Sequence, residues 1–198
     1  MMKKTLFATL TMAVFVSATA YAASETAVTA GGDFGGGTIN FTGSVTQAPC
    51  SIAPNDDNQT INLGQVSEKL LASSSGKGSS VVPVTIHLQS CDLSTTAGGT
   101  AFTKAHVEFT GAGIDMTNAA KGYLVNSGSA TNVAVQLTDL AGTAMDISTG
   151  KGTSDVALSS GDNNILQFGA HIVNSSTGGG TVTPGNVKAT VTYKLKYS

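Results

Sequence analysis

The sequence predicts an all-β fold, built as an antiparallel sandwich of short strands. Apolar and polar residues alternate with a period of two in several separate segments, and no long segment shows the period of a helix. Turn-forming clusters such as Pro54–Asp57 and Gly161–Asn164 separate these segments. The chain also has 24 glycines but only 4 prolines and no tryptophan, which indicates turns and strands rather than packed helices. Together these features are typical of a sandwich.

The strands are predicted at residues 38–45, 82–88, 107–109, 133–138, 165–173 and 187–197. Pro83 falls on the polar face of its segment, so that strand begins there or lies at a sheet edge. The last segment has the clearest pattern, because its apolar side chains alternate without interruption and lysines lie among the residues of the opposite face. One helical turn is expected at residues 68–73.

The first residues have the pattern of a secretory signal peptide. Two lysines near the start are followed by an almost unbroken apolar stretch from Leu6 to Val16, and Ala20–Ala22 supplies small residues where a signal peptidase cleaves. The stretch is too short for a membrane span, and a buried N-terminal helix is the alternative interpretation. We therefore assign residues 1–22 to a signal peptide and expect the mature chain, which begins at Ala23, to be exported.

Export places the two cysteines, Cys50 and Cys91, in an oxidising compartment. An even pair in an exported chain predicts one disulfide, with two free buried thiols as the alternative. On the chain-entropy model, closing a loop of this size stabilises a fold by about 3–4 kcal/mol.

The composition argues against several classes of function. Only 11% of residues are charged, the net charge is −2 and there is no basic run, so we expect no nucleic-acid partner. The histidines His87, His106 and His171 lie in separate predicted strands without the spacing of a zinc motif, and we expect all three to be solvated at the surface. The glycines at 35–37 lead into a predicted strand rather than a helix, so they form no phosphate-binding loop. No catalytic residue, metal site or cofactor site is predicted.

Three places in the chain share a pattern with a known family. The stretch 37–45, followed by Ala48–Ile52, matches an N-terminal extension that leads into a first strand and a first cysteine. Cys91 follows an alternating strand, as the partner cysteine does. Tyr197 is the penultimate residue, and Gly185 is the fourteenth from the end, which is the most specific match. With these features the sequence resembles the chaperone–usher pilins, close to the major subunits of type 1-like fimbriae.

The resemblance implies an immunoglobulin-like sandwich that lacks its final strand, so that a groove exposes the core. It implies an N-terminal extension at residues 23–45 and a pilin domain at 46–198, with the extension of one subunit filling the groove of the next by donor-strand exchange. The inserting face is predicted to be Gly35, Gly37, Ile39, Phe41 and Gly43, with Gly37 opposite a tight part of the groove. The strand beside the groove, which also contacts the chaperone, is predicted to contain Gly185, Val187, Ala189, Val191, Tyr193, Leu195 and Tyr197.

The implied partners are neighbouring pilin subunits, a periplasmic chaperone that lends a strand to the groove, and an outer-membrane usher where the exchange takes place. The implied location is a fimbria at the cell surface, reached through the periplasm. From the residues alone, however, 38–46 also fits the ordinary first strand of a self-complete sandwich.

Three classes of function are compared on this basis. A structural subunit of the pilus shaft, which supports bacterial adhesion, is favoured. The alternative within the family is an adhesin or an adaptor subunit, in which case a host-surface receptor is a further partner. A tip adhesin of this family usually carries a receptor-binding domain before its pilin domain, which we do not expect in a chain of this length. A secreted enzyme is the third class, and no constellation of residues supports it.

Overall fold

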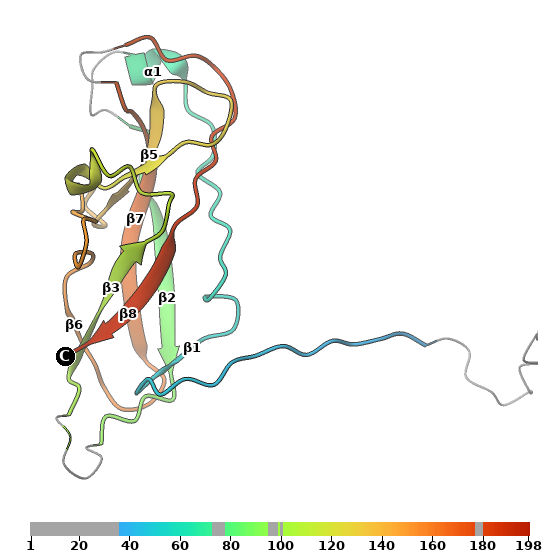
Figure 1. The fold of residues 1–198 in the computed structure, drawn as a ribbon, viewed down its shortest axis with the longest axis vertical. Coiled ribbons are helices and arrows are strands. Elements are labelled where there is room, and N and C mark those ends of the chain that lie inside the picture. The colour runs from blue at the N-terminus through green and yellow to red at the C-terminus, as the bar shows by residue number, and fades with distance from the viewer. Residues whose placement is uncertain (1–35, 73–77, 95–98, 100, 177–179) are drawn as a thin grey trace, which may run out of the picture. The chain divides into compact units, whose positions relative to one another are not determined.

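The computed structural model describes residues 36–72, 78–94, 99, 101–176 and 180–198 (Figure 1). The chain divides into two units between Val45 and Thr46, and each is described by itself. The predicted signal peptide lies outside the described residues.

The described part of the first unit, residues 36–45, contains no helix or strand. Its large apolar side chains are solvent-exposed, Ile39 by 76% and Phe41 by 90%. The strand expected at 38–45 is therefore not formed in the described part of this unit.

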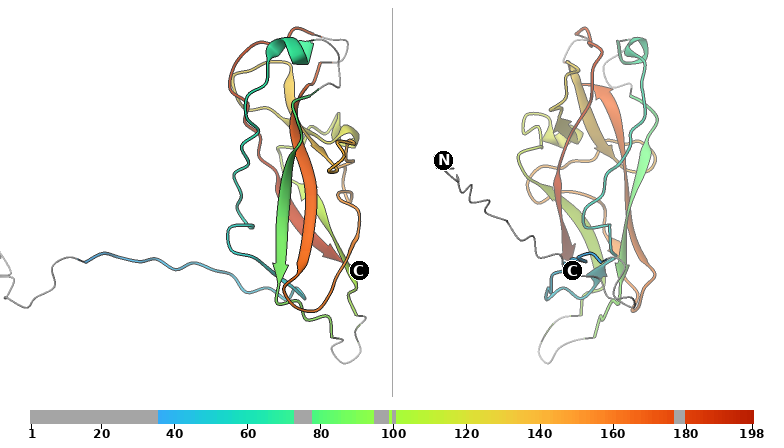
Figure 2. Two further views of the ribbon diagram at one scale, coloured as in Figure 1. Left: turned by 180° about the vertical axis from the view of Figure 1, so that it is seen from behind. Right: turned by 90° about the vertical axis from the view of Figure 1, so that its right-hand side faces the viewer.

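The second unit consists of antiparallel strands in two sheets, as predicted. The larger sheet has the order β1-β2-β7-β5-β4, formed by β1 (Ser51–Ile52), β2 (Val82–Gln89), β7 (Asn164–Asn174), β5 (Val133–Thr138) and β4 (Tyr123–Val125). The smaller sheet has the order β6-β3-β8, formed by β6 (Val156–Ala157), β3 (Lys104–Thr110) and β8 (Thr192–Tyr197). Figure 2 shows the two layers from behind and from the side. A short helix, α1 (Glu68–Ala72), and a 3-10 turn, η1 (Ala119–Lys121), lie in the connections.

The core fills the space between the two sheets. Alternate residues of each strand point inward, as Val84, Ile86 and Leu88 do from β2. Phe109 of β3 and Phe168 of β7 meet edge to face with their ring centroids 5.1 Å apart, which links the two layers. Burying one such side chain stabilises the fold by about 1.5–3 kcal/mol.

The prediction that His171 is solvated is wrong. Its side chain is buried in β7, where Nδ1 lies 3.1 Å from the Ser79 carbonyl oxygen and Nε2 lies 2.8 Å from Oε1 of Gln136. The reason is that both neighbours of β7 reach the ring: Gln136 of β5 contacts it from one side, and from the other side so does the carbonyl of Ser79, whose amide also pairs with the Ile172 carbonyl. His87 and His106 remain partly exposed, as expected.

The expected helical turn forms as α1, which buries Leu71. The Asn174 side chain donates a hydrogen bond of 3.1 Å to the Leu71 carbonyl, so the turn is held against the end of β7. Strands β1, β4 and β6 have only two or three residues each. Such segments are too short to show a periodic pattern, and for this reason the sequence does not reveal them.

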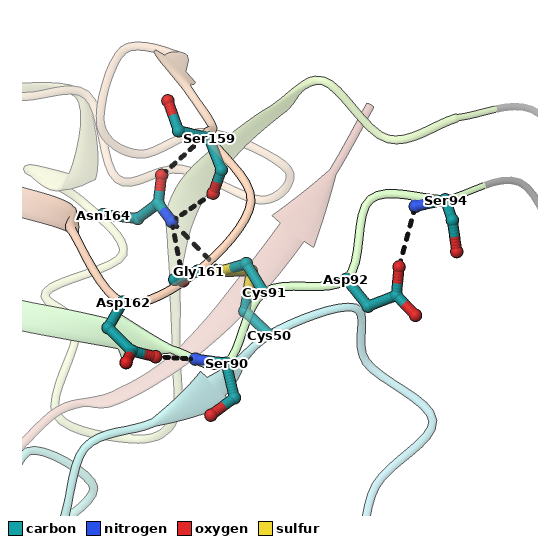
Figure 3. Close-up of a disulfide and its surroundings, with 9 residues drawn as sticks. All are labelled: Cys50, Ser90, Cys91, Asp92, Ser94, Ser159, Gly161, Asp162 and Asn164. Carbon is teal, nitrogen blue, oxygen red and sulfur yellow. Dashed lines mark hydrogen bonds between the residues drawn. A yellow bond between two sulfur atoms is a disulfide. The ribbon is translucent and has the colours of Figure 1, made fainter.

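The disulfide between Cys50 and Cys91 is present, as predicted (Figure 3). Cys50 directly precedes β1 and Cys91 follows β2. The bond therefore joins the start of β1 to the end of β2, its antiparallel partner. Both cysteines are buried. The buried side chain of Asn164 lies against the bond: its amide donates to the Ser159 carbonyl at 2.7 Å and contacts Cys91 Sγ at 3.2 Å.

Replacing both cysteines by alanine should lower the free energy of unfolding by about 2–5 kcal/mol, because the open chain gains entropy when it unfolds. Urea denaturation of the two proteins measures the loss. Alkylation without reductant, followed by mass spectrometry, supplies the control. If it finds two free thiols in the natural chain, the disulfide is contradicted.

Candidate functional site

A groove of about 1130 Å³ opens onto the core of the second unit. One wall is formed by residues 56–66 and the other by residues 182–193, and the two segments run along the domain in cyan and red (Figure 1). Its floor consists of core side chains from both sheets, which are Val84, Ile86, Phe109, Leu124, Val133, Val135, Leu137, Phe168, Ala170 and Ile172. An apolar groove that opens to the surface is typical of a binding site, so we take this groove as the candidate functional site.

The C-terminal wall is an extended segment whose backbone is bonded on one side only. The Ser127 amide donates to the Lys188 carbonyl at 2.8 Å, and the Ala130 amide donates to the Asn186 carbonyl at 3.1 Å. Backbone groups of successive residues in an extended chain point to opposite sides. Those of Val187 and Ala189 therefore face the groove, and in the described part of the chain they have no hydrogen-bond partner.

The other wall changes character along its length. Near its start it is attached to β2, since the Ala53 amide donates to the His87 carbonyl at 2.9 Å and the Gln59 side chain donates to the Thr85 carbonyl at 2.7 Å. From residue 60 to 66, the described structure contains no hydrogen bond from the backbone to a strand. This half of the wall therefore also presents unpaired backbone groups.

Among the described residues, one hydrogen bond joins the two walls. The Tyr193 hydroxyl, at the end of the C-terminal wall, donates to the carbonyl oxygen of Asp56 at 2.9 Å. Burial raises the pKa of Tyr193 to about 12, with further contributions from the negative charges of Asp56 and Asp57. The hydroxyl accordingly keeps its proton, and its role as donor, at every physiological pH.

The structure separates the residues predicted beside the groove into two sets. Gly185, Val187, Ala189, Val191 and Tyr193 line it, whereas Leu195 and Tyr197 do not. The predicted continuous strand is also too long, because the ladder of β8 begins only at Thr192. The earlier residues pair with a loop through a mixture of backbone and side-chain bonds, which is less regular than a ladder. The alternation of half-buried and exposed residues nevertheless continues from 187 to 198.

The predicted inserting face lies in the first unit. There Ile39 and Phe41 are exposed, and Gly37 and Gly43 have open space around the position of a Cβ atom. Gly35 lies outside the described residues. The tight surroundings predicted for Gly37 concern a neighbouring subunit and stay a prediction.

Sequence reasoning missed the wall at residues 60–66. Ile61 and Leu63 are partly buried against the core and are the signal that could have indicated it. Two alternating apolar residues are too few to stand out from a loop.

Within the described ranges, no three histidine, cysteine or carboxylate side chains are grouped so that they could hold a metal ion. The helices that the structure describes are too short to cross a membrane.

The comparison with known proteins decides the family. Residues 39–198 match the model of the family described as Fimbrial protein. The chain belongs to this family. It is therefore a structural pilin of a chaperone–usher fimbria, found at the cell surface, and the expectation that it is not an enzyme agrees with the family.

The relatives of this fimbrial protein cover nearly its whole length. Long polar fimbria protein A of Salmonella typhimurium is 33% identical over 100% of this chain and 98% of its own. The type-1 fimbrial protein A chain of Escherichia coli strain K12 is 35% identical over 94% and 97%. Among solved structures, the P pilus rod subunit PapA is 27% identical with a TM-score of 0.62, over 76% of this chain and 100% of that one. A subunit from the structure of a chaperone–usher pilus, described for rod uncoiling, is 29% identical with a TM-score of 0.66, over 84% and 98%.

The raised pKa of Tyr193 predicts a loss of stability in strong alkali. An unfolded tyrosine loses its proton near pH 10, whereas the folded one keeps it to about pH 12. The contribution of Tyr193 is thus complete below about pH 10 and is lost as the pH rises to about 12. The urea midpoint of the natural chain should fall more steeply over this range than that of Tyr193→Phe. Parallel curves for the two proteins would contradict the assignment.

Proposed function

We propose that this fimbrial protein is a subunit of the pilus shaft and polymerises by donor-strand exchange. The observation that carries the proposal is the groove, whose walls present unpaired backbone groups over an apolar floor. A strand inserted between the walls pairs with their free backbone groups and covers the apolar floor, because its backbone bonds to the walls and its alternate side chains enter the core. The exposed alternating face of residues 37–43 has the chemistry of such a strand, and it enters the groove of a neighbouring copy.

The open groove explains why the subunit needs a chaperone. An apolar floor with free strand edges is an aggregation hazard until a strand covers it. A periplasmic chaperone supplies that strand first and contacts residues 185–198, and an outer-membrane usher is where the next subunit replaces it. The signal peptide at residues 1–22 directs the chain to the periplasm, where the disulfide forms.

The shaft role is favoured over an adaptor or adhesin role. The relatives include a type-1 A chain and, among structures, a rod subunit, and the alignments extend over nearly the full length of those proteins. A surface of the shaft that binds a host receptor is the second candidate. Shafts assembled without any other pilus subunit, tested for binding to host cells, distinguish the two.

The first test places a charge on the inserting face. Phe41→Asp should give normal amounts of soluble chaperone–subunit complex but little or no polymer, because a buried unpaired carboxylate costs several kcal/mol. The matched control is Thr42→Asp, which places the same charge one residue later on the opposite face and should polymerise far better. The ladder of boiling-resistant polymers on a gel is the measurement.

Two outcomes contradict this proposal in different ways. Equal polymer from Phe41→Asp and Thr42→Asp would mean that residues 37–43 do not insert by alternate side chains. Loss of the Phe41→Asp complex before assembly would instead mean that this segment belongs to the subunit's own fold.

The second test shortens the chain. Removing residues 194–198 takes away most of β8 and its pairing with β3, so we expect no recoverable chaperone complex and an aggregated or degraded subunit. The control keeps the full length and changes only the exposed Lys194 and Lys196 to alanine, which should leave the complex intact. A truncated chain that accumulates as a stable soluble monomer would overturn the incomplete-sandwich model.

A further inference from the structure

We propose that the hydrogen bond from the Tyr193 hydroxyl to the Asp56 carbonyl is a stop that closes one end of the groove and fixes the register of the inserted strand. The proposal rests on the function proposed above. It assigns to Tyr193 a positioning role and identifies the point beyond which an incoming strand does not pair.

The acceptor of this bond is held in place by contacts with β2. The Asp56 carboxylate accepts hydrogen bonds from the His87 amide at 2.7 Å and from the His87 ring Nδ1 at 2.8 Å. The Asp56 amide donates to the Ala53 carbonyl at 3.1 Å, and the Gln59 side chain approaches the same carbonyl oxygen of Asp56 at 3.5 Å. The Asp56 carbonyl is therefore a fixed group rather than part of a free loop.

The donor, the Tyr193 hydroxyl, belongs to a side chain whose backbone is fixed by strand pairing. Tyr193 pairs with Phe109 in the ladder between β8 and β3, and the Phe109 ring packs on Phe168 in the groove floor. Its hydroxyl reaches across to the opposite wall. A strand inserted between two walls needs a spacing of about 4.8 Å on each side. At this position the Tyr193 side chain reaches from one wall to the other, and the Asp56 carbonyl already accepts its hydrogen bond.

The position of the bond coincides with the end of the lining. Tyr193 is the last residue of its wall that lines the groove and Asp56 is the first of the other wall. Leu195 and Tyr197 continue the same face of β8 without lining it. A strand that slipped by two residues would keep its apolar side chains on the core face. Alternation alone therefore does not choose between such registers, whereas a stop does.

The chain supplies a matched control for removing this hydroxyl. Tyr197 lies on the same strand and the same face, and its buried hydroxyl has no hydrogen-bond partner among the residues that the structure describes. Tyr193→Phe and Tyr197→Phe are the same chemical change at two positions, and only the first breaks a bond between the walls.

The experiment maps the register in assembled polymer. A photo-crosslinking amino acid replaces Asp57, which is exposed and lines the groove beside Asp56, and mass spectrometry locates the crosslinks on the inserted segment. We expect a single site in the otherwise natural polymer and in Tyr197→Phe. In Tyr193→Phe we expect sites two residues apart, together with dissociation of the polymer at a lower temperature. Tyr193→Leu repeats the test with a different side-chain volume, in case the phenylalanine variant fails to fold.

One crosslink site and an unchanged dissociation temperature in the Tyr193 variants would overturn the stop while leaving strand insertion intact. Failure of the natural chain and of Tyr197→Phe to form any polymer would overturn the proposed function, and the stop with it. Crosslinks to the subunit's own domain rather than to a neighbour's extension would also reject both.

Discussion

Backbone N–H and C=O groups removed from bulk water must find hydrogen-bond partners, and in this molecule two segments that border the core leave theirs unpaired. The backbone groups of Val187 and Ala189 face the groove, and residues 60–66 on the other side have no backbone hydrogen bond to a strand in the described structure, over a floor made of core side chains. A further strand in the groove would cover the apolar floor and pair with both walls at the same time. A side chain or a small apolar ligand could cover the floor, but only an extended backbone satisfies the walls as well.

The rest of the second unit fixes both ends of the wall at residues 56–66. The disulfide fixes the start of β1 to the end of β2, and Asn164 braces it from the first residue of β7. From that anchor the chain is bonded to β2 as far as Gln59 and then runs free. At the other end of this wall, α1 is secured through Leu71 and Asn174. Between these two ends Ile61 and Leu63 pack against the core, so the wall borders the groove along its length.

Alternation in the sequence was enough to predict the longer strands of the second unit, because one buried face imposes a period of two on Val84, Ile86 and Leu88. It failed at His171, since the burial of that side chain depends on contacts with Ser79 and Gln136, which are distant from it in the chain. It overestimated the regular strand before Thr192, where alternating side chains still contact the core but β3 has ended at Thr110 and the backbone bonds to a loop instead. The bond from Tyr193 to Asp56 joins residues 137 positions apart and leaves no trace in the local pattern.

A chain that carries one groove and one matching strand has a constraint on how it can assemble. In the proposed exchange, the groove of one copy and the extension of the next are different surfaces, so the contact is head to tail, and such contacts give either closed rings or open filaments. Because the chain is a pilin of a fimbria, the contact repeats along an open filament. On the proposed function, the register of each inserted strand then sets the spacing from one subunit to the next. Since a slip of two residues would shift that spacing by about 7 Å, a regular shaft requires a feature that selects one register, and the bond between the walls at Tyr193 has the position to provide it.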